Sequence, residues 1–269
     1  MITLDNETLR KLQLVQLEML QEVDRICKKC KIHYNIFAGT VLGSVRHGGY
    51  IPWDDDADVA MLRSEYEKFR RACETELDTT KFYFQDHRNT KGYRWGYGKI
   101  RRKDTLFLRE HQEHMPYEQG VFIDIFPLDG VPDNYLLRSI KNFQCFCVRK
   151  ILWSSVGKIA EKNLWKRKVY KLLERIPDEV IYSYYHGMIR KAKRKKTRMV
   201  RVLMFPTPNS EYGYYRNWFE TSSDMVFEGK TFRGITDYDS YLSFVYGDYM
   251  QPPPPEKRKV HPVSDIRLI

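Results

Sequence analysis

The sequence has no long apolar run and lacks the cysteine spacing of a disulfide or zinc protein. None of its apolar stretches approaches the roughly 20 residues that a membrane-spanning helix needs. The N-terminus has neither the basic start nor the apolar segment of a secretory signal. The 5 cysteines are an odd number and form no pair of C-x2-C motifs. We therefore expect a cytoplasmic protein with reduced thiols, no membrane-spanning helix and no structural zinc.

Acidic residues are the minority among the charged ones. The 269 residues include 46 Lys and Arg against 35 Asp and Glu, a formal net charge of +11. Such a surplus favours a polyanionic partner or surface. It is densest in Lys191–Arg198, a run that suits anionic lipid headgroups, RNA or simply a solvated helix face.

Helical and extended patterns alternate in the first half of the chain. Apolar spacing predicts a long helix from Asp5 to about Lys31, a strand over Tyr34–Ala38 that ends in a tight turn at Gly39-Thr40, and a second strand over Ala57–Leu62. Further strands are expected over residues 82–85, 95–101, 105–108 and 120–126. The fold class is therefore α/β, with a mixed sheet flanked by helices.

The second half is predicted to be largely helical. Residues 134–176 and 178–196 combine helical spacing with many Lys and Arg, and a short helix fits residues 239–246. We expect three segments: a catalytic core over residues 1–130, a helical basic accessory region over 131–205, and a C-terminal segment over 206–269 that packs back on the core.

Four carboxylates crowd into five positions at Asp54, Asp55, Asp56 and Asp58. Their mutual repulsion is most simply offset by a bound divalent cation. Asp56 and Asp58 are two positions apart, so a strand would place both on one face. Asp124, flanked by apolar residues, is costly to bury unless it is used or paired, and it could complete a site for Mg²⁺.

Two simpler interpretations of the acidic cluster compete with a catalytic metal site. The run could be a solvated acidic turn. It could also be a calcium loop, because Asp54, Asp56, Asp58 and Glu65 fall at positions one, three, five and twelve of an EF-hand pattern. Val59 stands where that loop needs glycine for its sharp turn, which argues against calcium.

Several separated blocks resemble the LicD family of phosphocholine transferases, within the nucleotidyltransferase superfamily that also includes fukutin-type proteins. The similar blocks are GTVLGSVRHGGYIPWDDDADVAMLRSEYEKF from Gly39, GVFIDIFPLDG from Gly120, FEGKTF from Phe227, and YDSYLSFVYGDYMQPPPPEKRKVHP from Tyr238. They occur in order between about Tyr34 and Pro262, and the middle of the chain, roughly residues 134–205, carries no recognisable motif.

The resemblance implies a nucleotidyltransferase-like catalytic core and a transfer reaction. Such proteins move phosphocholine from CDP-choline to a sugar hydroxyl of a cell-surface glycan precursor, such as teichoic acid or lipopolysaccharide, and release CMP. Asp56 and Asp58 would hold Mg²⁺, or Mn²⁺ in its place, and two ions could bind. Asp124 would be either the third metal ligand or the base that takes the proton of the acceptor hydroxyl.

The residues also suggest a substrate site. Gly39 and Thr40 suit a phosphate-facing turn, although an ordinary tight turn is the alternative. A quaternary ammonium is recognised by aromatic faces, for which Trp53 and Trp95 are candidates beside the core aromatics. Asp55 adjoins the proposed metal ligands. The cationic candidates for phosphate contact are Arg46, Lys99 and Arg101, and the basic block Lys257-Arg258-Lys259 with His261 could also reach the nucleotide.

Other functions remain open on these residues. A fukutin-type relative would transfer ribitol phosphate from CDP-ribitol, and a nucleotidyltransferase proper would attack an NTP and release pyrophosphate. A basic RNA- or membrane-binding module would use its acids only structurally. We expect the transferase, with a glycan or lipid-linked glycan acceptor, peripheral contact with an anionic membrane through Lys191–Arg198, and no nucleic-acid partner.

Overall fold

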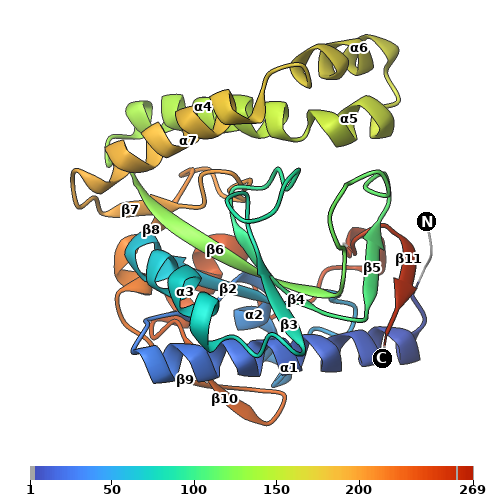
Figure 1. Cartoon of the computed structure of the whole chain (residues 1–269). Coiled ribbons are helices and arrows are strands. Elements are labelled where there is room, and N and C mark those ends of the chain that lie inside the picture. Colours follow the sequence, from blue (N-terminus) through green and yellow to red (C-terminus); the bar gives the residue numbers. More distant parts are fainter. Residues whose placement is uncertain (1–3, 259, 269) are drawn as a thin grey trace.

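A curved mixed sheet lies between a long N-terminal helix and a layer of four helices (Figure 1). The computed structural model describes residues 4–258 and 260–268. It confirms the predicted α/β fold. Among the described residues, none of the helices has the length and apolar character required to cross a membrane.

The sheet has the strand order β1-β2-β6-β4-β3, and β7 and then β8 continue from the far half of β6. Strands β2 and β6 run parallel, and the other pairs are antiparallel. The bounds are β1 (Asn35–Ile36), β2 (Asp58–Leu62), β3 (Phe82–Gln85), β4 (Gly98–Arg102), β6 (Phe122–Val131), β7 (Met199–Arg201) and β8 (Tyr214–Tyr215).

Strand β6 is longer than expected. The apolar pattern predicts its end at Phe126, but it continues through Pro127 to Val131. Its second half gains a new partner, because residues 129–131 pair with β7 from far along the chain. Long-range pairing therefore extends the strand past the proline that would otherwise favour a stop.

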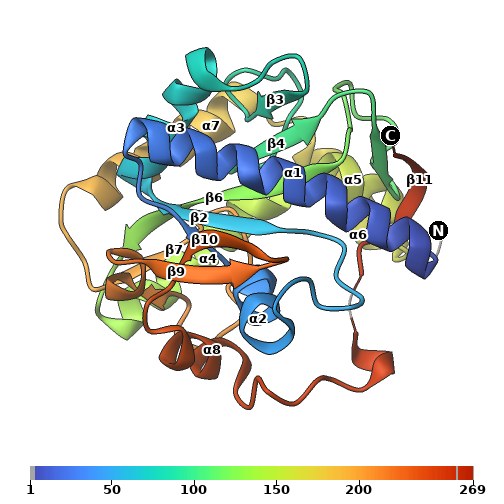
Figure 2. The ribbon, with the colours of Figure 1, turned by 90° about the horizontal axis from the view of Figure 1, so that it is seen from below.

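Helix α1 (Asn6–Cys30) crosses the lower face of the sheet (Figure 2). It begins where predicted, since the Asp5 carboxylate caps it by accepting the Thr8 N–H at 2.7 Å. Its buried residues include Leu12, Leu20 and Val23, which face the sheet side by side with helix α3 (Arg63–Glu76). These two helices close one side of the core.

The predicted turn at Gly39-Thr40 is wrong. A short β1 is followed at once by helix α2 (Ala38–His47), and the chain reverses at Ala38, whose φ of 47° lies in the left-handed region. Two glycines disfavour a helix here, but packing overrides that propensity. A Cβ on Gly43 would lie 2.4 Å from the Gly49 carbonyl oxygen, so the helix fits only with glycine.

Four helices form the layer on the opposite side from α1 (Figure 1). Their buried residues make a second core cluster, in which Cys145 and Val148 gather with Ile181, Tyr185 and Met188. The helices are α4 (Tyr135–Leu152), α5 (Ser154–Ala160), α6 (Leu164–Leu173) and α7 (Asp178–Lys193).

The C-terminal residues return to the first half of the chain. Hairpin β9 (Ser223–Phe227) with β10 (Lys230–Gly234) packs beside β1, and helix α8 (Tyr238–Tyr246) adds Tyr241 and Leu242 to the main core. Strand β11 (Val263–Arg267) pairs with β5 (Leu106–Arg109). One short 3-10 helix, Arg216–Phe219, precedes β9, and another, Pro255–Lys257, lies between α8 and β11.

A buried ion pair joins the sheet to the helical layer. The Arg63 guanidinium donates to both carboxylate oxygens of Asp129, at 2.9 and 2.5 Å, and to the Tyr185 hydroxyl at 3.1 Å. Tyr185 in turn donates to the Gly96 carbonyl at 2.7 Å. The pair therefore connects α3, β6 and α7.

Removing one member of this pair should be strongly destabilising. Asp129→Asn leaves the Arg63 charge buried without its counter-ion, and we expect the free energy of unfolding to fall by about 3 kcal/mol. Asp224→Asn breaks the exposed Arg233–Asp224 pair and should cost less than about 1 kcal/mol. Urea denaturation compares the two variants, and equal small losses would contradict the role given to Asp129.

Candidate active site

Three charged residues form one row across the sheet. Asp58 on β2 lies directly opposite Asp124 on the parallel strand β6, and Asp124 lies directly opposite Lys99 on β4. Residues that face each other in neighbouring strands share a face of the sheet. The Lys99 ammonium donates to Asp124 Oδ1. The register therefore brings together three residues that are far apart in the sequence.

Asp54 and Asp56 approach this row from the segment that enters β2. A Cβ on Gly39 would lie 2.7 Å from Asp54 Oδ2, so the glycine leaves room for that carboxylate at the start of α2. The Thr40 hydroxyl accepts the Asp58 backbone N–H at 2.8 Å and fixes the beginning of β2. Gly39 and Thr40 thus position two of the acids, although in a helix rather than in the predicted turn.

The acids perturb one another. Burial, followed by repulsion from Asp56, Asp124 and Asp54, raises the pKa of Asp58 well above its usual value. Burial and the charges of Asp56 and Asp55 do the same to the pKa of Asp54. Burial also raises the pKa of Asp56, against the opposing charge of His261. Holding all three ionised at neutral pH requires additional positive charge.

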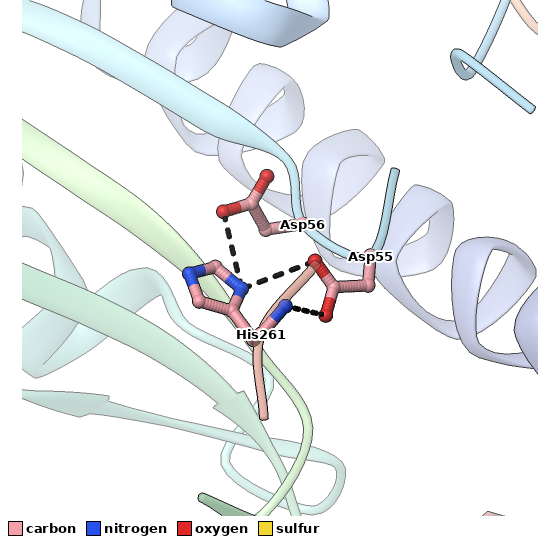
Figure 3. Close-up of side chains that lie close together, drawn as sticks. All are labelled: Asp55, Asp56 and His261. Atoms are coloured by element: carbon pink, nitrogen blue, oxygen red, sulfur yellow. Dashed lines mark hydrogen bonds and ion pairs between the residues drawn. The ribbon is translucent and has the colours of Figure 1, made fainter. Parts of the chain in front are cut away.

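His261 reaches the acids from the C-terminal segment (Figure 3). Its Nδ1 lies 3.1 Å from Asp55 Oδ1 and 3.6 Å from Asp56 Oδ2, and its backbone N–H donates to Asp55 Oδ2 at 2.8 Å. Among the described residues, Asp55, Asp56 and His261 form a group whose possible ligand atoms lie within 4.8 Å of one another. The basic block of residues 257–261 thus reaches the acids through His261. Its Lys259 lies outside the described residues.

The residues fit a hard divalent cation. Asp58 Oδ1 is buried and has no hydrogen-bond partner among the residues that the structure describes, as expected for an oxygen that binds something other than protein. Mg²⁺ and Mn²⁺ prefer such carboxylate oxygens. Two sets of metal ligands are possible, and Asp56 belongs to both. One is the predicted set with Asp58 and Asp124, and the other adds Asp55 and His261 to Asp56. The assignment of Asp56, Asp58 and Asp124 as ligands stays a prediction.

Lys99 also faces a small basic cavity. The cavity has a volume of about 130 Å³, and its lining includes Trp95, Lys99 and Arg101 together with Arg109 and Trp153. Burial lowers the pKa of Lys99 to about 8, and Arg101 adds to this effect, while Asp124 opposes it. Arg101 is held by the Gln85 side chain and the Gly120 carbonyl, both at 2.6 Å. Cationic and aromatic groups together suit a phosphate next to a flat ring.

Two of the predicted residues make contacts away from the row. Arg46 donates to the Tyr249 carbonyl at 2.7 Å and so holds the C-terminal segment. The Trp53 ring is covered by the Arg258 guanidinium, 4.0 Å from its centroid, so one face of Trp53 already accepts a cation. Neither contact links these residues to Lys99.

Sequence reasoning did not single out Arg109 or Trp153. Arg109 ends β5, which is paired by β11 from the other end of the chain, and Trp153 lies between α4 and α5. Their approach to Lys99 depends on long-range packing. No local motif marks either residue.

The site lies within a region that matches a known family. Residues 31–141 match the family described as "LicD/FKTN/FKRP, nucleotidyltransferase domain". Residues 31–141 form a LicD-family nucleotidyltransferase domain. All the candidate residues from Gly39 to Asp124 fall inside this domain, while Trp153 and His261 lie beyond it. The resemblance noted from the sequence blocks is therefore confirmed.

Similarity to one relative extends over almost the whole chain. The "Lipopolysaccharide cholinephosphotransferase LicD" of Haemophilus influenzae is 29% identical over 97% of this chain and 98% of its own length. Two uncharacterised proteins, from Rickettsia typhi and Rickettsia prowazekii, are 35% and 33% identical over 20% and 24% of this chain, and over 18% and 26% of their own lengths. These matches agree with the expectation of a LicD-like transferase.

The carboxylate cluster predicts how the LicD-family domain responds to cations. Asp58→Asn removes one of the mutually repelling acids, so we expect the cation-free variant to melt about 2–4 °C higher. Mg²⁺ or Mn²⁺ should then raise its melting temperature less than that of the unsubstituted protein. Thermal unfolding over a cation titration measures both effects. Asp265→Asn, at an exposed position, should leave both unchanged.

The same titration separates the two roles of Asp124. If Asp124 is a metal ligand, Asp124→Asn should reduce the cation-dependent gain as Asp58→Asn does. If it is the base, the gain should persist while activity is lost. A cation-dependent gain that survives in Asp58→Asn would contradict the assignment of Asp58 as a ligand.

Proposed function

We propose that this protein transfers phosphocholine from CDP-choline to a sugar hydroxyl of a cell-surface glycan precursor and releases CMP. The observation that carries the proposal is the row Asp58, Asp124 and Lys99, set in a LicD-family domain beside the acids at Asp54 and Asp56. The name of the full-length Haemophilus relative supports both phosphocholine as the transferred group and lipopolysaccharide as the kind of acceptor. Teichoic acid is the alternative glycan.

The donor would contact two groups of residues, one acidic and one basic. Asp56 and Asp58, with Asp124, would hold Mg²⁺, or Mn²⁺ in its place, as one ion or two. Such ions neutralise charge on the diphosphate as its bond to CMP breaks. Lys99 and the cavity beside it would receive a phosphate, because the cavity is lined by cations.

The acceptor step moves one phosphoryl group and one proton. The sugar oxygen attacks the phosphorus that carries choline, the phosphorus–oxygen bond to CMP breaks, and a base takes the hydroxyl proton. Asp124 is suited to take that proton if it is not a metal ligand. Lys99 holds one of its oxygens and so orients the carboxylate.

The choline group would lie at Trp53 rather than at Trp95. The surroundings of Trp95 are basic, with Lys99 and Arg101 in the same cavity, and would repel a quaternary ammonium. Trp53 adjoins the acids in the sequence, which favour a cation; the Arg258 guanidinium covers one face of its ring, so choline would contact the other face or replace Arg258. A choline cation would use the same kind of contact.

The activity is tested with alternative donors. Purified protein with Mg²⁺ and a lipopolysaccharide extract is supplied with CDP-choline, CDP-ribitol or CTP and followed by ³¹P NMR. We expect CMP and a new phosphodiester signal from CDP-choline, and at least a 100-fold slower reaction with Asp58→Asn, since one oxyanion-stabilising interaction is worth about that much. Consumption of CDP-ribitol alone would identify another polyol phosphate, and pyrophosphate from CTP would identify a nucleotidyltransferase.

The choline contact is tested by binding. Trp53→Ala should weaken CDP-choline binding about 10-fold, because a desolvated cation–π contact contributes about 1–2 kcal/mol, while CMP binding stays unchanged. Calorimetry with both ligands measures the difference. Trp165→Ala, at an exposed position in α6, is the control. Equal losses for CDP-choline and CMP would refute a choline-specific role.

We also propose peripheral contact with an anionic membrane through Lys191–Arg198. A membrane-borne acceptor precursor would make such contact useful, and clustered Lys and Arg bind anionic lipid headgroups. All 5 cysteines are free thiols, which agrees with the cytoplasmic face of that membrane.

A further inference from the structure

The positive charge of the protein is confined to one part of the chain. Residues 135–198, here called the helical layer, carry 18 Lys and Arg against 4 Asp and Glu, a net charge of +14. The remaining residues carry 28 against 31, a net charge of −3. Figure 1 shows the helices α4–α7 of this layer stacked on one side of the sheet. The attraction for a polyanionic surface therefore belongs to the layer as a whole, not only to Lys191–Arg198.

The same layer exposes most of the large apolar side chains. Of 21 such side chains that are exposed among the described residues, 13 lie between Tyr135 and Tyr184. Scattered exposed apolar residues are normal on a soluble protein, but concentration in one region marks an interaction surface.

Helix α4 is apolar on two opposite sides. Cys145, Val148 and Leu152 face the second core cluster. Leu136, Ile140 and Phe143, spaced i, i+4 and i+7, lie on the other side and are 68%, 50% and 65% exposed. A surface helix normally presents polar residues there. The solvent side of α4 therefore lacks the polar face that water alone would require.

Helix α6 repeats this pattern. Trp165, Val169 and Leu172 have the same spacing and are 74%, 46% and 63% exposed, whereas Tyr170 is the residue of this helix that is buried. Lys166, Arg167, Lys168 and Lys171 occupy the positions between them. Apolar side chains bordered by Lys and Arg are typical of helices that lie in a membrane interface.

We propose that the solvent side of α4 and α6 is a docking face for an anionic phospholipid surface. Phe143, Trp165 and Leu172 enter the boundary of the acyl chains, and the lysines around them contact headgroup phosphates. A groove of about 660 Å³ between α4 and α7 offers a place for one headgroup; its lining includes Lys141, Lys191 and one acid, Glu179, beside Val180 and Tyr184.

Charge distinguishes this partner from the alternatives. A second copy of the chain would bring two surfaces of +14 together, and their repulsion opposes dimerisation. RNA would satisfy the cations but leave the aliphatic side chains without an apolar environment. An anionic bilayer satisfies both.

Docking would orient the proposed transferase. Trp153 of the layer lines the cavity beside Lys99, so the layer and the site share one side of the sheet. This consequence rests on the proposed function, whereas the docking itself does not.

Vesicle binding tests the docking face. Full-length protein is centrifuged with phosphatidylcholine vesicles containing 30% phosphatidylglycerol, or none, at low and high salt. We expect binding to the anionic vesicles only, weakened by salt, and at least a 10-fold weaker partition for Phe143→Ser/Trp165→Ser. Leu14→Ser/Val226→Ser removes two exposed apolar residues of α1 and β9 and should bind as the unsubstituted protein does.

Tryptophan fluorescence gives a second readout. Trp165 should shift its emission to shorter wavelength on anionic vesicles, and Trp165→Phe should abolish that shift. Binding that persists in Phe143→Ser/Trp165→Ser would overturn apolar insertion, as would equal binding to neutral vesicles. If the protein is a dimer in solution and Phe143→Ser/Trp165→Ser makes it monomeric, the face would instead be the contact between two copies of the chain.

The assay contains neither donor nor acceptor. Asp58→Asn should bind vesicles as the unsubstituted protein does, so loss of the transferase proposal would leave the docking result intact. Circular dichroism confirms that each variant is folded.

Discussion

The parallel pairing of β2 with β6 is the constraint on which the site depends. It sets Asp58 beside Asp124, and the antiparallel pairing of β6 with β4 then adds Lys99 to the same row. A shift of one residue in either register would turn a side chain of the row to the opposite face. Asp54 and Asp56 join from the segment that α2 supports through Gly39 and Thr40. The sheet therefore concentrates negative charge at one place and holds a single lysine against it.

That concentration has an energetic consequence for the whole protein. The pKa values of Asp54, Asp56 and Asp58 are all raised, mainly by burial and with a contribution from their neighbours. A fold that keeps such acids together gives up stability unless a cation or proton offsets the repulsion. Lys99 provides part of the offset through Asp124, and His261 from the C-terminal segment lies against Asp55 and Asp56. The polar site thus combines residues of the first half of the chain with His261 from the C-terminal segment.

The opposite charge is concentrated in the helical layer. The Arg63–Asp129–Tyr185 contacts fasten that layer to the sheet. The layer carries the net positive charge of the protein and an excess of exposed apolar side chains. An acidic site and a basic, apolar surface within one chain would suit the proposed transfer from a charged donor next to an anionic surface.

The sequence by itself determined the α/β class, the long first helix, the helical character of residues 134–196 and the LicD-family resemblance, because periodicity and ordered local motifs carry that information. It also selected Asp56, Asp58, Asp124 and Lys99 as candidates. It failed at Gly39-Thr40, where close packing against Gly49 and Asp54 makes a helix out of residues that favour a turn. Only the tertiary structure decided that Arg109 and Trp153 line the cavity beside Lys99, and that His261, a candidate for nucleotide contact from the sequence, lies against Asp55 and Asp56. Those contacts come from strand register and the return of the chain end, and such long-range pairings leave no local trace in the sequence.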